Sequence, residues 1–225
     1  MLGKRYQKIK KEINSSKVFT LEEAIDFFKK SPHAHFDETI EIHLKLLIDP
    51  QKTEQQIRGV VILPYGTVKK KRIAAFVSPA KEAEVKEAGA DLVGGVELIN
   101  KIQETKKCDF EVAVAEPILM KDLARIAKIL GPKGLMPNPK VGTVSTEPKK
   151  VVEELKKGRI VFKNDEGGNL HQGLAKVSWP KESILGNIKA YLEAVKKARP
   201  SGVKSNFIAS AYLSTTMGPS LRVKL

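Results

Sequence analysis

Alternating apolar and polar residues predict half-buried strands toward both ends of the chain. From residue 40 to 48 nearly every second residue is apolar and most of the others are polar, so one face of this strand is expected in the core. Residues 60–63 form a shorter apolar run. Ile160 and Phe162 alternate in the same way, and 175–179 is expected to be their partner strand. The tail strand places four more residues on one face: Phe207, Ala209, Ala211 and Leu213.

Helical spacing and capping signals predict helices around these strands. Residues 4–15 form a basic segment with helical character. Thr20 and Glu23 have the spacing of a capping box, so a second helix is expected to begin there and to end near Pro32. A long helix over 181–198 is expected after a proline, with its apolar residues at helical spacing.

The middle of the chain follows a different pattern, in which short continuous apolar strands alternate with helices. This alternation is typical of a parallel sheet with helices on its faces. The sequence therefore predicts α/β and α+β parts in two domains. An α+β domain is built from residues 1–66 and 158–225, and a Rossmann-like three-layer α/β domain is inserted at 67–157. Two connections, near Gly66 and Gly158, also predict a hinge.

The charge balance points to a polyanionic partner. The chain has 40 Lys and Arg against 26 Asp and Glu, for a net charge of +14. The discontinuous domain has 22 basic and 13 acidic residues and the inserted domain 18 and 13, so the polyanion is expected mainly on the discontinuous domain. Aromatic residues make up only 6% of the chain, which argues against a binder that stacks many bases.

Several classes of protein are disfavoured by the same composition. Cys108 is the only cysteine, so neither an internal disulfide nor a thiol zinc site is expected, and the chain suits a reducing cytosol. The four histidines form no HExxH pair. No run approaches the ~20 apolar residues of a membrane span, and the basic start lacks a signal-peptide core. We therefore expect no metal, no cofactor and no membrane contact.

Four polar segments allow two interpretations each. The tail places hydroxyls and Met217 at a strand end, for an RNA backbone or merely for a turn. Residues 163–171 form a hairpin or loop that either contacts nucleic acid or is a plain turn. Residues 131–140 lack the ending of a P-loop, and a rigid structural loop is favoured over a nucleic-acid contact. The basic run 69–72 could contact phosphates or be an exposed strand lead-in.

Specific strings resemble one known family over nearly the whole chain. They include FDETIEIHLKL at 36–46, ILGPKGLMPNPKVGTV at 129–144, RIVFKNDEGGNLH at 159–171 and YLSTTMGPSLRV at 212–223. The sequence is similar to bacterial-type members of the universal family of large-subunit ribosomal protein number one. The resemblance implies a monomer within the cytoplasmic ribosome that binds large-subunit rRNA to form the mobile stalk. It also implies contact with exit-site tRNA during its release, and repression of translation through the protein's own operon mRNA. It implies no catalysis.

The resemblance also implies which residues face RNA. By position they are Phe36, Thr39, Lys163, Asp165, Gly168, His171, Ser210, Thr215, Thr216, Met217, Gly218 and Ser220. Hydroxyls and main-chain amides suit the 2′-hydroxyls and phosphates of a shaped RNA. The family pattern has basic residues where this chain has His35 and Glu166, which puts contacts from those two positions in doubt. Two alternatives remain: an enzyme that uses the inserted domain as a nucleotide site, and a basic RNA chaperone without RNA preference.

Overall fold

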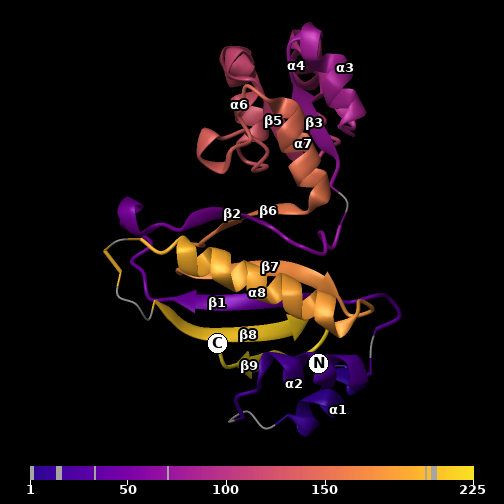
Figure 1. The fold of residues 1–225 in the computed structure, drawn as a ribbon, viewed down its shortest axis with the longest axis vertical. Coiled ribbons are helices and arrows are strands. Elements are labelled where there is room, and N and C mark those ends of the chain that lie inside the picture. Colours follow the sequence, from indigo (N-terminus) through magenta and orange to yellow (C-terminus); the bar gives the residue numbers. More distant parts are fainter. Residues whose placement is uncertain (1–2, 14–16, 33, 70, 201, 204–206) are drawn as a thin grey trace. The chain divides into compact units, whose positions relative to one another are not determined.

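The chain folds into two compact units. The computed structural model describes all residues except 1–2, 14–16, 33, 70, 201 and 204–206 (Figure 1). Unit 1 comprises Met1–Val68 and Ile160–Leu225, and unit 2 comprises Lys69–Arg159. Both boundaries lie within two residues of the junctions expected near Gly66 and Gly158. Lys70 of the basic run 69–72 lies outside the described residues.

Unit 1 is built on a four-stranded antiparallel sheet with the strand order β7-β1-β8-β9. The strands are β1 Thr39–Leu46, β7 Asn169–Lys176, β8 Ile208–Thr215 and β9 Leu221–Val223. The predicted alternation of β1 is confirmed, because its inward residues Ile40, Ile42, Leu44 and Leu46 are at most 2% exposed. Helix α8, Lys181–Lys197, packs its apolar side on this buried face (Figure 1).

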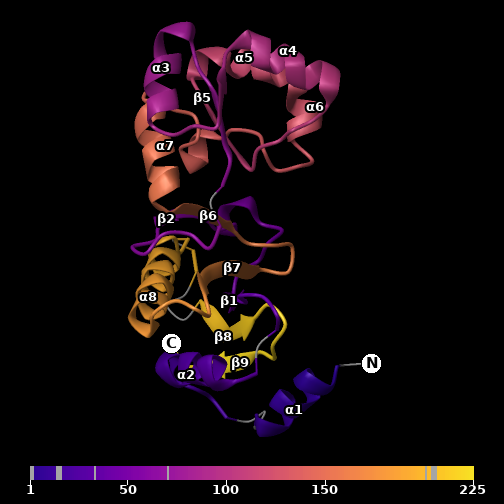
Figure 2. The same ribbon diagram turned by 90° about the vertical axis from the view of Figure 1, so that its right-hand side faces the viewer.

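Two N-terminal helices lie beside the β9 edge of this sheet (Figure 2). Helix α1 spans Lys4–Glu12 and is shorter than expected; residues 14 and 15 lie outside the described part of the chain. Helix α2 spans Leu21–Lys30. Its predicted capping box is confirmed, since Thr20 Oγ1 accepts from Glu23 N–H at 3.2 Å and Glu23 Oε2 accepts from Thr20 N–H at 2.9 Å.

The expected pairing of residues 160–162 with 175–179 is wrong. Strand β6, Arg159–Lys163, pairs with β2, Arg58–Ile62, in a separate two-stranded sheet, while β7 pairs with β1. The ring of Phe162 packs on Gly59, where an added Cβ would lie 2.4 Å from it, so the pair fits only because position 59 has no side chain. Alternation reveals a strand's inward face but not its neighbour. The loop after β6 therefore joins two different sheets and is not a hairpin between paired strands.

The tail strand contains a bulge that interrupts the expected face. Leu46 pairs with Ile208 and Lys45 with Ser210, so Ala209 is an additional residue on β8. Ala209 is exposed, whereas Phe207, Ala211 and Leu213 are buried as expected. The bulge places Ser210 opposite Lys45, on the face away from the core.

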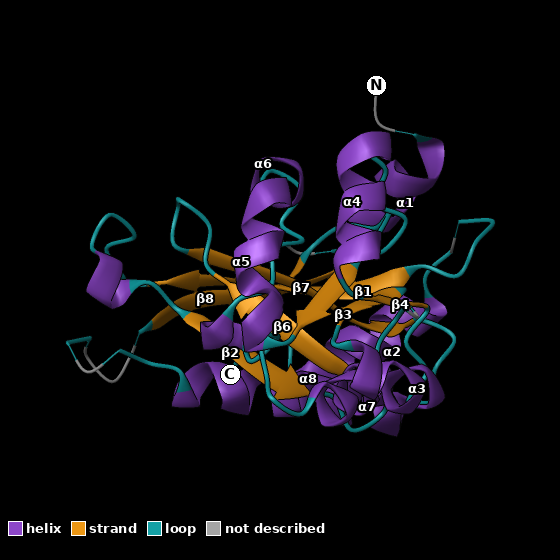
Figure 3. Cartoon of the chain, turned by 90° about the horizontal axis from the view of Figure 1, so that it is seen from above, coloured by secondary structure: helices purple, strands orange, loops and turns teal. Residues whose placement is uncertain are grey.

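Unit 2 has the predicted three layers. Its parallel sheet has the order β4-β3-β5, with β3 Ile73–Phe76, β4 Leu92–Gly94 and β5 Val112–Ala115. Helices α3 Pro79–Glu87 and α7 Pro148–Lys157 cover one face; α4 Val96–Thr105, α5 Met120–Leu123 and α6 Ala127–Leu130 cover the other (Figure 3). Gly158 ends α7 with a φ of 116°.

The expected helix over 118–130 is broken into short pieces. Helices α5 and α6 are separated by a 3-10 turn at Ala124–Ile126 and preceded by another at Pro117–Leu119. Further 3-10 turns occur at Thr53–Gln55 and Pro139–Val141. Within the described residues, no helix is both long enough and apolar enough to span a membrane.

Candidate nucleic-acid interface

The face of the four-stranded sheet opposite α8 carries a row of polar and aromatic side chains. His171 pairs with His43, His43 with Tyr212, and Tyr212 with Arg222, so one row crosses all four strands. Directly paired residues project to the same side of a sheet. We call this surface the open face and these four residues the cross-strand row. His171, Tyr212 and Arg222 are exposed, and His43 is half-buried.

The two histidines of the row belong to a chain of polar contacts. Their Nδ1 atoms are 2.8 Å apart, and His43 Nε2 lies 2.9 Å from Ser214 Oγ. His171 Nε2 lies 3.4 Å from Asp165 Oδ2. Two ring nitrogens at this separation share one proton, so at least one ring is neutral. Burial, followed by the charge of His171, lowers the pKa of His43 below 6.5, and Glu41 opposes this shift.

Asp165 and Gly168 shape the loop after β6. Asp165 Oδ1 accepts from the N–H groups of Gly167, at 2.9 Å, and Asn169, at 2.7 Å. These hydrogen bonds, led by that from Asn169, hold the pKa of Asp165 below its usual value. Gly168 has a φ of 72°, and its carbonyl accepts from Leu46 N–H at 3.0 Å. The two residues fix the loop, which leaves Lys163 and His171 exposed at its ends.

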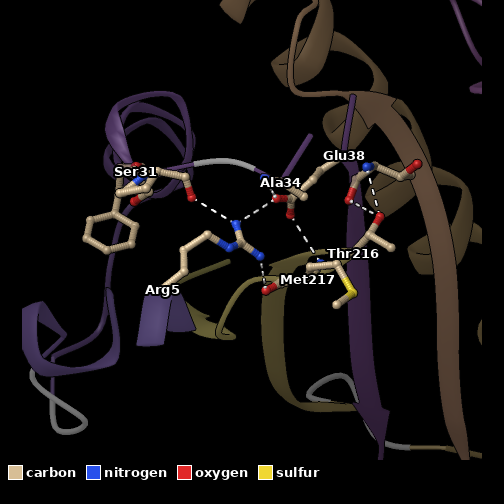
Figure 4. A network of polar contacts seen from close by, with 9 residues as sticks. Arg5, Ser31, Ala34, Glu38, Thr216 and Met217 are labelled. Atoms are coloured by element: carbon tan, nitrogen blue, oxygen red, sulfur yellow. Dashed lines mark hydrogen bonds and ion pairs between the residues drawn. The ribbon is translucent and has the colours of Figure 1, made fainter. Parts of the chain in front are cut away.

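A buried carboxylate organises the turn between β8 and β9, residues 216–220, which we call the tail turn (Figure 4). Glu38 is 1% exposed; its Oε1 accepts from Arg5 at 3.0 Å and from Ala34 N–H at 2.8 Å, and its Oε2 accepts from Met217 N–H at 3.1 Å. Arg5 also donates to the Met217 carbonyl at 2.8 Å. The backbone of Met217 is thus held on both sides, by Glu38 and by Arg5.

The pKa of Glu38 is the balance of opposing effects. Burial, the largest, raises it. Hydrogen bonds from the Thr215 hydroxyl, the Ala34 and Met217 N–H groups and Arg5 together outweigh burial, so the pKa lies below 4.5. Glu38 is therefore a charged anchor for the turn at neutral pH.

The hydroxyls of the tail do not all face solvent. Thr215 is 7% exposed and bonds to Glu38. Thr216 Oγ1 accepts from Thr39 N–H at 2.9 Å, and Thr216 N–H donates to the Thr39 carbonyl at 3.1 Å. An added Cβ at Gly218 would lie 2.2 Å from Thr215 Oγ1, so this position requires glycine. These contacts build the turn rather than offer free groups to a ligand.

Two apolar side chains remain exposed at this end of the sheet. Met217 is 54% exposed and Phe36 is 52% exposed. Phe36 is therefore not a core residue, and Glu38, two positions along the chain, is buried instead. Ser220, beyond Pro219, is also exposed.

The structure thus sorts the predicted RNA-facing residues into two groups. Phe36, Thr39, Thr215, Thr216, Met217, Gly218 and Ser220 lie where β1 begins and β8 ends; Lys163, Asp165, Gly168 and Ser210 lie where β1 ends, and His171 belongs to the cross-strand row. A strand of eight residues separates the groups by about 23 Å. The cross-strand row lies between them. Arg5, Glu38, His43 and Tyr212 belong to this surface, yet the sequence patterns did not identify them.

The loop 131–140 and Cys108 have structural roles in unit 2. In the loop 131–140, Asn138 N–H donates to Thr143 Oγ1 at 2.8 Å and Gly134 has a φ of 68°, as expected of a rigid loop. Cys108 is partly buried against the apolar core of unit 2. The described part of the chain contains no group of three or more His, Cys, Asp or Glu side chains that could hold a metal ion.

Comparison with known proteins identifies the family. The Ribosomal protein L1p/L10e family matches residues 28–219. The chain belongs to this family. It is 47% identical to the large ribosomal subunit protein uL1 of Thermosipho melanesiensis over 98% of this chain and 95% of the relative. Identity to the uL1 proteins of Fervidobacterium nodosum and Thermus thermophilus is 45% and 43%, over 99% and 98% of this chain and 95% and 96% of those relatives.

Membership of the ribosomal protein L1 family favours a ribosomal protein over the two alternatives, a nucleotide-binding enzyme and a basic RNA chaperone. Its members are structural constituents of the large ribosomal subunit, and they are not enzymes. The expected ribosomal, cytoplasmic location and the expected absence of catalysis are confirmed by these relatives.

Proposed function

We propose that unit 1 binds a folded segment of large-subunit ribosomal RNA and so anchors the mobile stalk of the ribosome. The observation that carries this proposal is the tail turn. Three elements that are distant in sequence, α1, the start of β1 and the end of β8, meet at Glu38 and present Met217 and Phe36 to solvent. An exposed turn whose backbone is held by hydrogen bonds suits an RNA that is recognised by its shape.

The surroundings of the turn support the same proposal. The open face adds imidazoles, hydroxyls and Arg222, and Lys163 stands at the far end of β1. Because unit 1 has the larger excess of positive charge, phosphates are attracted mainly to it. The two groups of residues, about 23 Å apart, fit a folded RNA that spans the sheet better than one short contact.

We further propose that the chain assists the release of deacylated tRNA from the exit site, and that it represses translation by binding its own operon mRNA. Both roles use unit 1 as the RNA anchor. For the second, the messenger must present the same shape as the ribosomal RNA to the tail turn. The two RNAs then compete for one surface.

A competition experiment tests the proposal. The full chain is titrated with a stalk fragment of large-subunit RNA in filter binding, with a scrambled RNA of equal length as competitor, at fixed physiological salt. Specific recognition predicts a preference of about 10³-fold or more. Equal binding of both RNAs would leave only charge attraction and would refute the proposed recognition.

A further inference from the structure

A pocket of about 320 Å³ lies between α1 and the β8–β9 edge of unit 1. Tyr6 and Lys10 line it from α1, Tyr212 from β8 and Arg222 from β9. Tyr6 and Lys10 are four residues apart, so they share one face of the helix. The volume is at the lower end of the ~300–1,000 Å³ range of ligand pockets. It suits one nucleotide and is too small for a duplex.

The lining is cationic and aromatic. Its nine described residues include three cations and no carboxylate. Lys17 lies 3.9 Å from Glu23 and over the ring of Phe19, whereas neither Lys10 nor Arg222 forms a salt bridge with any described residue. Two tyrosine rings and two such cations match an aromatic base that carries a phosphate.

The pocket continues the surface that carries the proposed function. Tyr212 and Arg222 belong both to the lining and to the cross-strand row, and Ser220 of the tail borders the pocket. Arg5 holds α1 against this edge through Glu38 and the Met217 carbonyl. The position of Tyr6 and Lys10 is thereby fixed before any ligand arrives.

We propose that this pocket binds a single unstacked nucleotide of RNA, with its base against Tyr6 or Tyr212 and its phosphate between Lys10 and Arg222. The proposal rests on the proposed function and extends it, because the pocket would take a single-stranded nucleotide next to the folded segment held at the tail turn. The occupant is a nucleotide within RNA rather than a free nucleotide, since the pocket shares Tyr212 and Arg222 with the row that crosses the sheet.

The test uses the full chain and fluorescein-labelled hexauridylate in anisotropy titrations. Lys10→Ala is expected to weaken binding about fivefold and to reduce the slope of log K against log salt by about 0.7. Tyr6→Leu, which keeps an apolar side chain on α1, is expected to weaken it about fivefold or more. Lys8→Ala removes the same charge from the same helix outside the pocket and is the matched control.

Circular dichroism and thermal unfolding confirm that each variant is folded. A 4-thiouridine oligonucleotide should crosslink to Tyr6 or Tyr212, as mapped by mass spectrometry. If hexauridylate binding is unaffected by both pocket variants, or is weakened equally by Lys8→Ala, the proposed nucleotide pocket is wrong. Binding of uridine monophosphate as tight as that of hexauridylate would overturn the assignment to RNA.

The same variants in the stalk-RNA titration separate the two proposals. A specific stalk-RNA complex together with unchanged hexauridylate binding refutes the pocket and leaves the proposed function standing. Loss of RNA preference in the stalk titration, with pocket-dependent hexauridylate binding retained, refutes the proposed function and leaves the pocket.

Discussion

The main chain and the side chain of Met217 have different roles. Glu38 and Arg5 hold its main chain, while its side chain is 54% exposed. Met217→Glu should therefore leave the fold intact and weaken binding of stalk RNA by about 1–3 kcal/mol, because a carboxylate would face phosphates. Filter binding measures this loss. Met217→Leu is the control, and equal affinities for wild type and Met217→Glu would remove the tail from the interface.

Glu38 should affect stability rather than contact RNA directly. Glu38→Gln removes a charged acceptor from four hydrogen bonds and should lower the free energy of unfolding by about 1–3 kcal/mol at pH 7. Because the folded-state pKa is lowered, the carboxylate stabilises the fold above its unfolded value of 4.5, and this contribution is lost as pH falls through the folded-state pKa.

Urea unfolding at pH 7 and pH 3.5 measures both effects for Glu38. The difference between wild type and Glu38→Gln should shrink at the lower pH. Glu12→Gln, an exposed carboxylate at the end of α1, provides the control. A constant difference at both values of pH would show that the charge of Glu38 does not anchor the turn.

Contacts between distant residues are what the sequence could not reveal at this scale. Arg5 reaches Glu38 across 33 positions and Met217 across 212. No periodicity links such residues, so Arg5 looked like one more charge of a basic helix. The capping box of Thr20 and Glu23 was predictable because its two residues are three positions apart and bond within one turn.

At the scale of elements, the pairing of β1 with β7 makes two histidines neighbours. Since the pKa of folded His43 is lowered, its neutral form stabilises the fold above pH 6.5, and this stability is lost as pH falls from 6.5 to the folded-state pKa. His43→Gln, which cannot titrate, should show a flatter dependence of unfolding free energy on pH between 8 and 5.

Chemical unfolding at pH 8, 6 and 5 measures this dependence on His43. The groups that face its ring are Glu41 and Lys45 on β1, His171 and Asp165 on and before β7, and Tyr212 on β8, with Arg222 beyond it. The exposed His35 gives the control variant His35→Gln. Identical pH profiles for wild type and His43→Gln would contradict the lowered pKa of His43.

Helices and strands were predictable where a sequence pattern within a few residues determines them. The alternation of β1 and the glycine that ends α7 each act within a few residues. The bulge at Ala209 and the pairing of β6 with β2 depend on which strand lies alongside. Residues 118–130 form short helices and 3-10 turns, although the spacing of their apolar residues predicts one helix. Tertiary packing decides those features.

At the scale of the whole molecule, the two units differ in the hydrophobic pattern of their strands, and this difference was visible in the sequence. Half-buried alternating strands belong to unit 1 and continuous apolar strands to unit 2, because only the latter are covered on both faces. The clustering of RNA-facing candidates at two ends of one sheet was not visible in the sequence. It required the strand order β7-β1-β8-β9, in which β8 lies beside β1 and runs antiparallel to it, so that the end of β8 meets the start of β1.

The two segments of unit 1 that lead to and from unit 2 are held by contacts within unit 1. Strands β2 and β6 pair with each other, so the chain leaves unit 1 and returns to it along adjacent strands. Buried Asn187 of α8 fixes the outgoing end: its Oδ1 accepts from Tyr65 N–H at 3.1 Å, and its Nδ2 donates to the carbonyls of Gly66, at 3.2 Å, and Leu174, at 2.8 Å. None of these contacts involves unit 2.

A chain in which a short Gly-Ser bridge replaces residues 69–158 should therefore fold and bind stalk RNA. Its affinity should stay within about tenfold of that of the full chain, equivalent to 1.4 kcal/mol, because the tail turn and the cross-strand row lie entirely within unit 1. Filter binding with the scrambled competitor measures this affinity, and Met217→Glu in the shortened chain should weaken it as in the full chain. A folded shortened chain without RNA preference would show that recognition requires unit 2.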